Sequence, residues 1–296
     1  MILSRDNVSP YIIGTMRLGS WGSNLLTKEY EEFIEGCLEL GLIDFDHADI
    51  YGDYTTEADF GKVLKSRPDL RKKIRITTKC GIKMMTDNRP QHLLKSYDLS
   101  KEHIKTSVEK SLKSLQTDYI DVLLLHRPDY LLDPHEIAAA FSDLKKEGKV
   151  HTFGVSNFSP SQFDLLNSLT PLATNQVEIS LLQRKAFEDG TLDQCLRYKS
   201  IPAAWSPLGG GLLFKDSEND GVKAIKGVLD TLSKKYGLAA DQILYAWLRK
   251  HPAGIIPVLG TSKLERIRTA HNALNTTITH EEWYMLWEAA IGGEIA

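Results

Sequence analysis

The amino-acid sequence predicts an α/β protein folded as one closed (β/α)8 barrel, the TIM-barrel architecture. Eight short runs of β-branched or leucine-rich residues alternate with longer segments of helical periodicity along the 296 residues. No stretch rich in proline, glycine or serine and no block of charge interrupts this alternation, so residues 1–296 are expected to form a single domain. Hydrophobic residues make up 42% of the chain and charged residues 25%, as in ordinary globular proteins with a sizeable core.

The first half of the chain carries half of the expected barrel. Strands are predicted at Ile12–Thr15, Leu42–Asp46, Ile74–Thr78 and Ile120–Leu125. The first helix is predicted to begin near Thr27, as its N-cap, and to end before Gly41, where a left-handed residue is expected. Further helices are expected over Glu57–Lys65, over the apolar stripe from Ile104 to Leu115, and from Ile137 to Gly148.

The second half of the chain continues the alternation. Strands are predicted at Val150–Val155, Thr174–Ile179, Ile201–Trp205 and Ile255–Leu259. Helices are predicted around Phe163–Leu169, Leu192–Tyr198, Lys223–Tyr236, Asp241–Lys250 and Leu264–Leu274. A last helix, over about residues 279–291, begins with the capping-box pattern Thr279 to Glu282 and is expected to dock on the outside of the barrel.

A doubly wound nucleotide-binding sheet is the alternative architecture for alternating strands and helices. That fold should show G-x-G-x-x-G after an early strand, with an acidic residue about 20 positions later. The only glycine cluster here is Gly209–Gly211, late in the chain, so the barrel is favoured.

The balance of charges and the shortness of the apolar runs argue against nucleic-acid and membrane partners. Lys plus Arg is 36 and Asp plus Glu is 39, a balance that gives no general attraction to nucleic acid or anionic lipid. No apolar run approaches the roughly 18 residues that a membrane helix needs. Polar residues from Arg5 to Asn7 interrupt any secretory signal, and the three cysteines are widely spaced, so a cytoplasmic protein without nucleic-acid or membrane partners is expected.

Polar residues follow the predicted strands at the end where barrel enzymes gather their active sites. They are Asp46, Lys79, His126, Ser156, Asn157, Gln176, Ser206 and Gly260. Each has an ordinary structural explanation when taken alone, such as helix capping or a surface charge. Their recurrence at successive strand ends predicts a site on this face.

Four residues have a joint chemical meaning. A tyrosine has a pKa near 10, so on its own it is a poor acid at neutral pH. A neighbouring ammonium lowers this pKa. Tyr51, Lys79 and Asp46 could therefore form a general-acid unit that protonates a developing alkoxide. His126 could orient a carbonyl oxygen at the same point.

These residues stand in motifs that resemble the aldo-keto reductase superfamily, and among its members the bacterial oxidoreductases that carry DHADIYG and HRPD. The motifs are FDHADIYG, TTKCG, LLLHRPD, GKVHTFGVSNF, TNQVEIS, AWSPLGGG and PVLGTSKLER, in this order over nearly the whole chain. The resemblance implies a barrel enzyme that uses NADPH, with Tyr51 as general acid, Lys79 and Asp46 as its activating pair, and His126 as the carbonyl-orienting residue.

The resemblance also implies where NADP(H) would bind. Ser156, Asn157 and Gln176 match residues that hydrogen-bond the nicotinamide carboxamide, and Trp205 matches an aromatic residue that stacks on the nicotinamide. Ser206, Leu208 and Gly209 match the lining of the pyrophosphate.

The segment GTSKLER resembles the part of the family that holds the adenosine phosphate. Its candidates are Gly260, Ser262, Lys263 and Arg266. The chain departs from the family pattern at Thr269–Ala270, and a shift of two residues would use Lys263, Arg268 and Asn272 instead, so both registers stay open with Arg266 preferred. A second departure, His47 beside Asp46, is given no catalytic role.

The main functional hypothesis is therefore an NADPH-dependent reductase of a small aldehyde or ketone, with no metal. The alternative is a regulatory NADP-binding subunit with little turnover, as the family also contains. A metal-dependent hydrolase is disfavoured, because it would need histidine and carboxylate ligands at several strand ends, His126 is the only strand-end histidine placed for such a role, and Lys79 would repel a cation. The physiological substrate, the oligomeric state and the conformation of the long polar loop Gly81–Asp98 cannot be predicted from the sequence.

Overall fold

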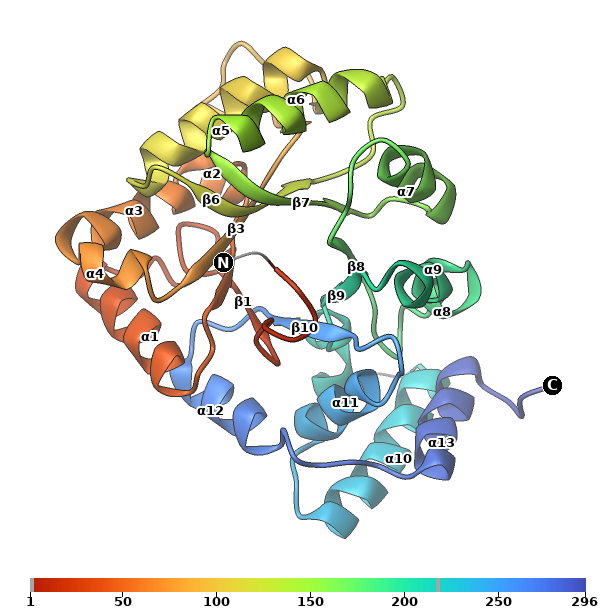
Figure 1. Cartoon of the computed structure of the whole chain (residues 1–296). Helices are drawn as coiled ribbons and strands as arrows, with labels where there is room; N and C mark the ends of the chain where they lie inside the picture. The colour runs from red at the N-terminus through yellow and green to blue at the C-terminus, as the bar shows by residue number, and fades with distance from the viewer. Residues whose placement is uncertain (1–2, 217–218) are drawn as a thin grey trace.

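Eight parallel strands close into a barrel in the computed structural model, which describes residues 3–216 and 219–296 (Figure 1). Around the barrel the strands follow the order β1-β10-β9-β8-β7-β6-β3-β2. Their bounds are β1 Ile12–Gly14, β2 Asp44–Asp46, β3 Arg75–Cys80, β6 Ile120–Leu125, β7 Val150–Ser156, β8 Thr174–Glu178, β9 Ile201–Trp205 and β10 Ile256–Leu259. The predicted (β/α)8 architecture is confirmed, and the doubly wound alternative is wrong.

Helices surround the barrel and connect its strands (Figure 1). The longer ones are α1 Thr27–Glu39, α3 Thr56–Ser66, α5 Lys101–Leu115, α6 Pro134–Lys146, α7 Pro160–Asn167, α9 Thr191–Tyr198, α10 Asp220–Tyr236, α11 Ala240–Arg249, α12 Leu264–Asn272 and α13 His280–Ile291. Short ones are α2 Tyr51–Tyr54, α4 Pro68–Arg71, α8 Lys185–Glu188 and the 3₁₀ segment η1 Gly209–Phe214. The predicted long helices are present, with boundaries that differ by a few residues.

The beginning of α1 corrects one prediction. Thr27 is the first helical residue and Leu26 is the N-cap, whose backbone N–H donates to the Glu29 carboxylate at 2.8 Å. The glutamate in the first turn therefore satisfies the backbone N–H of the N-cap residue, and no threonine hydroxyl caps the helix. Gly41 has the left-handed conformation expected after the helix, with φ of 71°.

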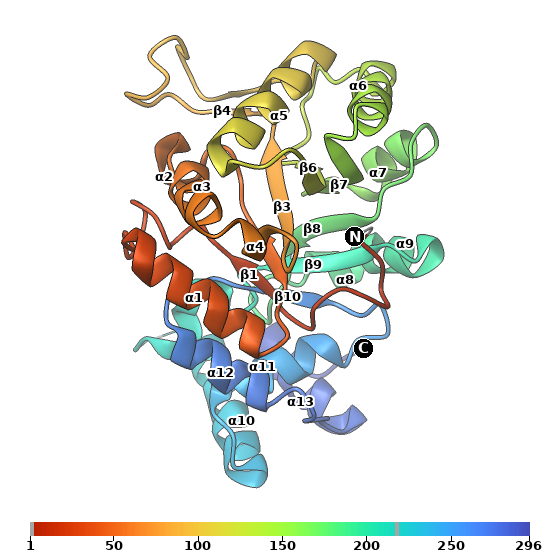
Figure 2. The same cartoon turned by 60° about the vertical axis from the view of Figure 1, so that its left-hand side comes forward.

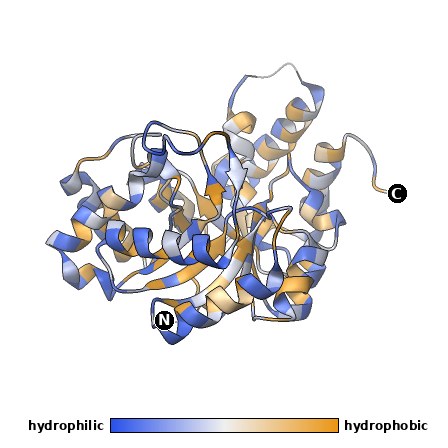
Figure 3. Ribbon diagram, turned by 90° about the horizontal axis from the view of Figure 1, so that it is seen from above, coloured by the Kyte–Doolittle hydropathy of each residue, from blue (hydrophilic) through white to orange (hydrophobic). Residues whose placement is uncertain are grey.

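Apolar residues gather on the strands at the centre, and polar residues colour much of the helical layer around them (Figure 3). All six residues of β6 are buried, which explains its nearly continuous apolar run. At the amino-terminal face of the barrel, the fully buried Arg75 of β3 hydrogen-bonds both carboxylate oxygens of Asp44 on β2. This ion pair stabilises the amino-terminal face of the barrel, whereas the active sites of such barrels lie at the carboxyl-terminal face.

Two peripheral features complete the fold. The segment Gly81–Asp98 contains a small antiparallel pair, β4 Ile82–Lys83 and β5 Ser96–Tyr97, and the loop between them projects beyond α2 and α5 (Figure 2). Helix α13 packs along α10 on the outside of the barrel. Among the described residues, no helix combines the length and apolarity needed to cross a membrane.

Candidate active site

The four predicted catalytic residues meet at the carboxyl-terminal face of the barrel. Asp46 is the last residue of β2, Lys79 lies one residue before the end of β3, and His126 follows β6 directly. Tyr51 begins the short helix α2, which the β2 loop places over the same face. Parallel strands carry these residues to one edge of the barrel although they are far apart in the sequence.

The Lys79 ammonium is the centre of this group. Its Nζ donates to Asp46 Oδ2 at 2.8 Å, to the backbone carbonyl of His47 at 2.8 Å, and to the Tyr51 hydroxyl at 3.1 Å. An ammonium has three N–H donors, so these three bonds use all of them. Because the Tyr51 oxygen accepts from Lys79, its own proton is free to point away from the lysine. Sequence reasoning found the two side-chain partners but not the His47 carbonyl.

The pKa of Tyr51 differs from the expectation. Lys79 was expected to bring it below the ordinary value, but burial raises the pKa of Tyr51 above 10.0, and the Lys79 charge offsets only part of this effect. Burial would also lower the pKa of Lys79, but Asp46 and Tyr51 outweigh it and the net shift is upward. At neutral pH the lysine is therefore charged and the tyrosine protonated, the state that a general acid requires.

His126 lies against the ring of Tyr51. The two ring centroids are 6.0 Å apart in an edge-to-face arrangement, and the indole of Trp21 lies 6.2 Å from Tyr51. Burial, reinforced by the positive charges of Lys79 and Arg127, holds the pKa of His126 well below its usual range. The imidazole is therefore neutral, and it can hydrogen-bond a carbonyl oxygen without competing with Tyr51 for the proton.

The predicted carboxamide-binding residues form a hydrogen-bonded chain. Trp205 Nε1 donates to Asn157 Oδ1 at 3.0 Å, and Asn157 Nδ2 donates to Ser156 Oγ at 2.8 Å. Ser156 Oγ in turn donates to the backbone carbonyl of Gln176 at 2.8 Å. Gln176 Nε2 donates to Asp46 Oδ1 at 3.0 Å, so the chain ends on the carboxylate that holds Lys79.

These hydrogen bonds leave the side-chain oxygen of Gln176 free to accept a hydrogen bond from a bound amide. Gln176 uses its Nε2 on Asp46, and among the described residues its Oε1 accepts no hydrogen bond. An amide oxygen has two lone pairs, so Gln176 Oε1 can accept from a carboxamide NH2. The exposed part of the Trp205 ring offers a flat apolar surface beside it.

Backbone conformation marks the same region. Asn157 and Ser206 have positive φ values, 61° and 49°, which are uncommon for residues with a side chain. Such conformations gather at functional sites, where surrounding structure holds them. Both lie directly after a strand, Asn157 after β7 and Ser206 after β9.

Glycines leave space for a ligand after β9. Gly209, Gly210 and Gly211 have φ between 59° and 82°, and a Cβ at Gly210 or Gly211 would meet nothing within 4 Å. Leu208, between Ser206 and these glycines, packs into the core and anchors the loop. An open, glycine-lined backbone suits the close approach of a pyrophosphate.

The predicted phosphate segment lies at the start of α12. Gly260 follows β10 with open space where a Cβ would stand, and no side chain caps the helix at Lys263. Lys263 and Arg266 are exposed there, and Ser262 Oγ contacts Ser23 Oγ at 2.5 Å. A helix N-terminus with two cations and a hydroxyl matches the chemistry of phosphate binding.

The alternative phosphate register is less well placed. Arg268 Nη2 lies 3.6 Å from Glu39 Oε2 at the end of α1, so this guanidinium turns toward the neighbouring helix. Arg266 has no ion pair with any described residue. The donor set therefore fits the dinucleotide in the preferred register, which uses Arg266.

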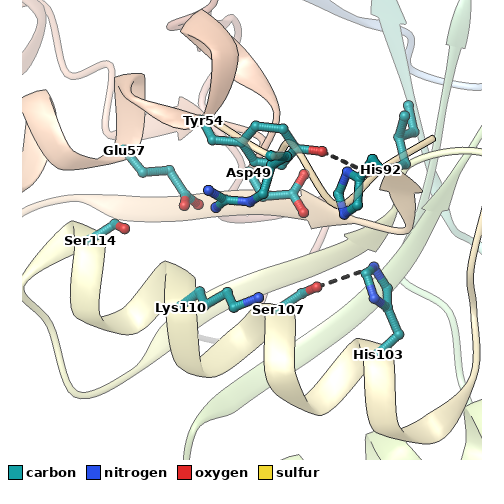
Figure 4. A pocket seen from close by; sticks show the side chains of 10 residues that line it. Asp49, Tyr54, Glu57, His92, His103, Ser107, Lys110 and Ser114 are labelled. Atoms are coloured by element: carbon teal, nitrogen blue, oxygen red, sulfur yellow. Dashed lines mark hydrogen bonds between the residues drawn. The ribbon is translucent and has the colours of Figure 1, made fainter. Parts of the chain in front are cut away.

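A separate recess lies beside the segment after β2 that carries Tyr51, between α3, α5 and the β4–β5 loop (Figure 4). It is lined by Asp49, Tyr54, Glu57, Ile82, Arg89, His92, His103, Ser107, Lys110 and Ser114. None of the predicted catalytic or cofactor-binding residues lines this recess, which lies on the outer side of β3.

The chain matches known proteins over nearly all of its length. A model of the Aldo/keto reductase family matches residues 10–291. The uncharacterized oxidoreductase YcsN of Bacillus subtilis is 44% identical over 290 residues, 97% of this chain and 96% of that protein. A 6-dehydroglucose reductase of Agrobacterium fabrum is 43% identical over 291 residues, 98% of this chain and 96% of that protein.

A solved structure extends the comparison to the fold. The aldo/keto reductase from Klebsiella pneumoniae, in complex with NADP and acetate, superimposes with a TM-score of 0.76 at 25% identity. The match covers 94% of this chain and 90% of that one. Family match, close relatives and shared barrel agree: the chain belongs to the aldo/keto reductase family.

Proposed function

We propose that this chain is an NADPH-dependent reductase of aldehydes and ketones in which Tyr51 is the general acid. The observation that carries the proposal is two sets of hydrogen bonds that meet at Gln176: one runs from Trp205 through Asn157 and Ser156 to the Gln176 backbone carbonyl, and the other from the Gln176 side chain through Asp46 and Lys79 to the Tyr51 hydroxyl. Together they link the residues that fit the nicotinamide to those that fit proton transfer. One side of the reaction centre is thereby coupled to the other by fixed side chains.

The cofactor would supply the hydride to the carbonyl carbon. Gln176, Asn157 and Ser156 would hold its carboxamide, Trp205 would stack on the ring, and Ser206, Leu208 and Gly209 would line the pyrophosphate. Gly260, Ser262, Lys263 and Arg266 would hold the adenosine phosphate.

The proton comes from this chain. Tyr51 hydrogen-bonds the carbonyl oxygen and donates its proton as negative charge develops there. Lys79 stabilises the resulting phenolate, because its ammonium already donates to the tyrosine oxygen at 3.1 Å. Asp46 keeps the ammonium charged and oriented, and neutral His126 offers a second hydrogen bond to the same carbonyl oxygen.

Replacing Tyr51 by Phe tests the proposal. The variant keeps the ring between Trp21 and His126 but has no proton to donate, so aldehyde reduction should fall by on the order of 10²-fold or more. NADPH binding should persist, because none of the proposed cofactor contacts involves the hydroxyl. NADPH oxidation measured with an aldehyde panel gives the rate, and quenching of tryptophan fluorescence gives the binding.

Tyr54→Phe is the matched control in the same loop. Its hydroxyl contacts the backbone of Ile82 and Met84 rather than Lys79, so the rate should stay within a few-fold of the wild type. If Tyr51→Phe keeps most of the activity, another group donates the proton. If wild-type protein binds NADPH and reduces none of the aldehydes, the regulatory-subunit alternative replaces the proposal.

A further inference from the structure

The residue after His126 brings a positive charge to the mouth of the site. Arg127 is partly exposed, and its guanidinium carbon lies 5.6 Å from the centroid of the Trp205 ring. Its charge reaches Tyr51, where it is one of the influences that oppose the effect of burial on the pKa. Arg127 is therefore close to the aromatic residue proposed for nicotinamide stacking and within electrostatic reach of the proposed proton donor.

Beyond the Trp205 ring, this guanidinium has no polar partner among the described residues. Among the described residues, Arg127 makes neither a hydrogen bond nor an ion pair, although Arg71 and Arg75 of the same barrel do. A guanidinium presents five N–H donors in a planar fork, and partly buried ones are usually paired. Its donors are therefore available to a molecule that enters the mouth.

A carboxylate without a hydrogen bond or ion pair among the described residues lies on β8, the strand beside the one that carries Trp205. Glu178 ends β8 directly beside Trp205 in the register of the barrel, and it too has no hydrogen bond or ion pair among the described residues. Burial raises the pKa of Glu178, and the Arg127 charge offsets part of that rise, which places the two groups within electrostatic reach. The guanidinium offers only donors, and the carboxylate in its ionised form offers only acceptors.

We propose that Arg127 and Glu178 are specificity residues that bind hydroxyl groups beside the reacting carbonyl, so that the preferred substrates are polyhydroxylated aldehydes of the sugar type. The inference rests on the proposed function, whose substrate class it narrows. A hydroxyl both donates and accepts, so a neighbouring pair of hydroxyls can satisfy the guanidinium and the carboxylate together.

The opposite charges argue against an anionic substrate. A carboxylate on the substrate would gain attraction from Arg127 but would meet the negative charge of an ionised Glu178 at the end of β8. A simple alkyl aldehyde would leave both groups without partners as it displaced their water, which carries a free-energy cost. A neutral, oxygen-rich aldehyde avoids both penalties.

Kinetics with matched aldehydes test the inference. D-Glyceraldehyde and propanal have the same carbon chain and differ in two hydroxyl groups, and succinic semialdehyde adds a carboxylate. Wild-type kcat/KM should favour D-glyceraldehyde over propanal. Arg127→Met and Glu178→Met should each reduce that preference by about 10- to 100-fold, mainly through KM, while kcat/KM for propanal stays within a few-fold.

Lys95→Met is the control for a general charge effect. The Lys95 charge also reaches His126, but this exposed residue lies in the β4–β5 loop and has no role in the proposed pair. It should leave the preference for glyceraldehyde unchanged. The same loss in Lys95→Met and Arg127→Met would overturn the inference in favour of long-range electrostatics.

Other outcomes would also overturn the inference. Equal losses on propanal and glyceraldehyde in Arg127→Met would make the arginine part of the general machinery. A wild-type preference for succinic semialdehyde that Arg127→Met removes would assign the site to carboxylates. In all of these cases the proposed function stands; if the wild type reduces no aldehyde, the proposed function fails and the inference with it.

Discussion

At the residue scale, the proposed chemistry depends on how the donors of Lys79 are distributed. All three are used within the protein, so the ammonium acts on a substrate only through Tyr51. Asp46 is held from its other side by Gln176, which fixes the carboxylate between an amide and an ammonium. A change at Gln176 would therefore disturb proton transfer as well as cofactor binding.

The choice of phosphate register is a prediction about single residues. Arg266→Ala should weaken NADPH binding by roughly 10- to 150-fold, the range for a charge-assisted hydrogen bond, and should affect NADH little. The reason is that only NADPH carries a 2′-phosphate for this guanidinium. Titrations of both cofactors with wild type and variant measure the effect.

Arg268→Ala, two residues further along α12, is the matched control. It removes a partly exposed ion pair with Glu39 and should change neither cofactor affinity by more than a few-fold. A selective loss of NADPH binding in Arg268→Ala would instead assign the phosphate to the alternative register. Equal weakening of NADPH and NADH in Arg266→Ala would contradict a 2′-phosphate role.

At the element scale, the strands and long helices could be predicted from the sequence because burial leaves a periodic pattern over many residues. The β4–β5 pair could not, since two-residue strands are too short to show alternation. The N-cap at Leu26 was missed because Glu29, three residues later, supplies the acceptor. The pKa of Tyr51 was predicted in the wrong direction because its burial depends on residues that are distant in the sequence, such as Trp21.

The contact between α3 and β3 carries a prediction about stability. Glu57 on α3 is buried and accepts from Thr78 Oγ1 at 2.6 Å, on the outer side of the strand that bears Lys79 (Figure 4). Burial raises the pKa of Glu57 from 4.5 to about 7, against the opposing hydrogen bonds of Thr78 and Ser111. Between these pH values the folded state keeps the proton that the unfolded state releases, so stability falls as pH rises.

Glu57→Gln should remove this pH dependence. The amide stays neutral and can still accept from Thr78, so the variant should match the wild type near pH 4.5 and exceed it by up to about 3 kcal/mol at pH 8. Urea unfolding from pH 5 to 8 measures the difference. The exposed Glu102→Gln on α5 should show none. A difference for Glu57→Gln that is constant with pH would rule out ionisation as its cause.

At the scale of the whole molecule, the last helix closes the outside of the barrel rather than its mouth. Trp283 of α13 stacks on the fully buried Trp247 of α11 at 5.1 Å, and each indole N–H donates to the backbone carbonyl of the other tryptophan. Trp287 extends the stack, with its ring 5.3 Å from that of Trp283. This packing holds α13 on the outside of the barrel. Only the loops at the carboxyl-terminal face are then left to enclose the candidate active site.

Those loops leave the mouth open. Tyr130 and Leu131, after β6, are 90% and 91% exposed, and Leu93 in the β4–β5 loop is 87% exposed. No described segment covers these apolar side chains. A substrate therefore has few contacts beyond Trp21, Tyr51, His126 and the proposed Arg127–Glu178 pair.

We accordingly predict broad substrate specificity with high KM. An open site excludes little water and makes few contacts with remote parts of a substrate, so little binding energy is available for discrimination. Small, aromatic and bulky aldehydes without neighbouring hydroxyl groups should all be reduced, with values of kcat/KM spread over about 10²-fold or less and with reactive aldehydes favoured over large ones. Trp283→Ala should lower the melting temperature but leave these ratios unchanged, because α13 packs away from the mouth. A single substrate preferred by about 10⁴-fold, or ratios that change in Trp283→Ala, would show that loops or α13 enclose the pocket after all.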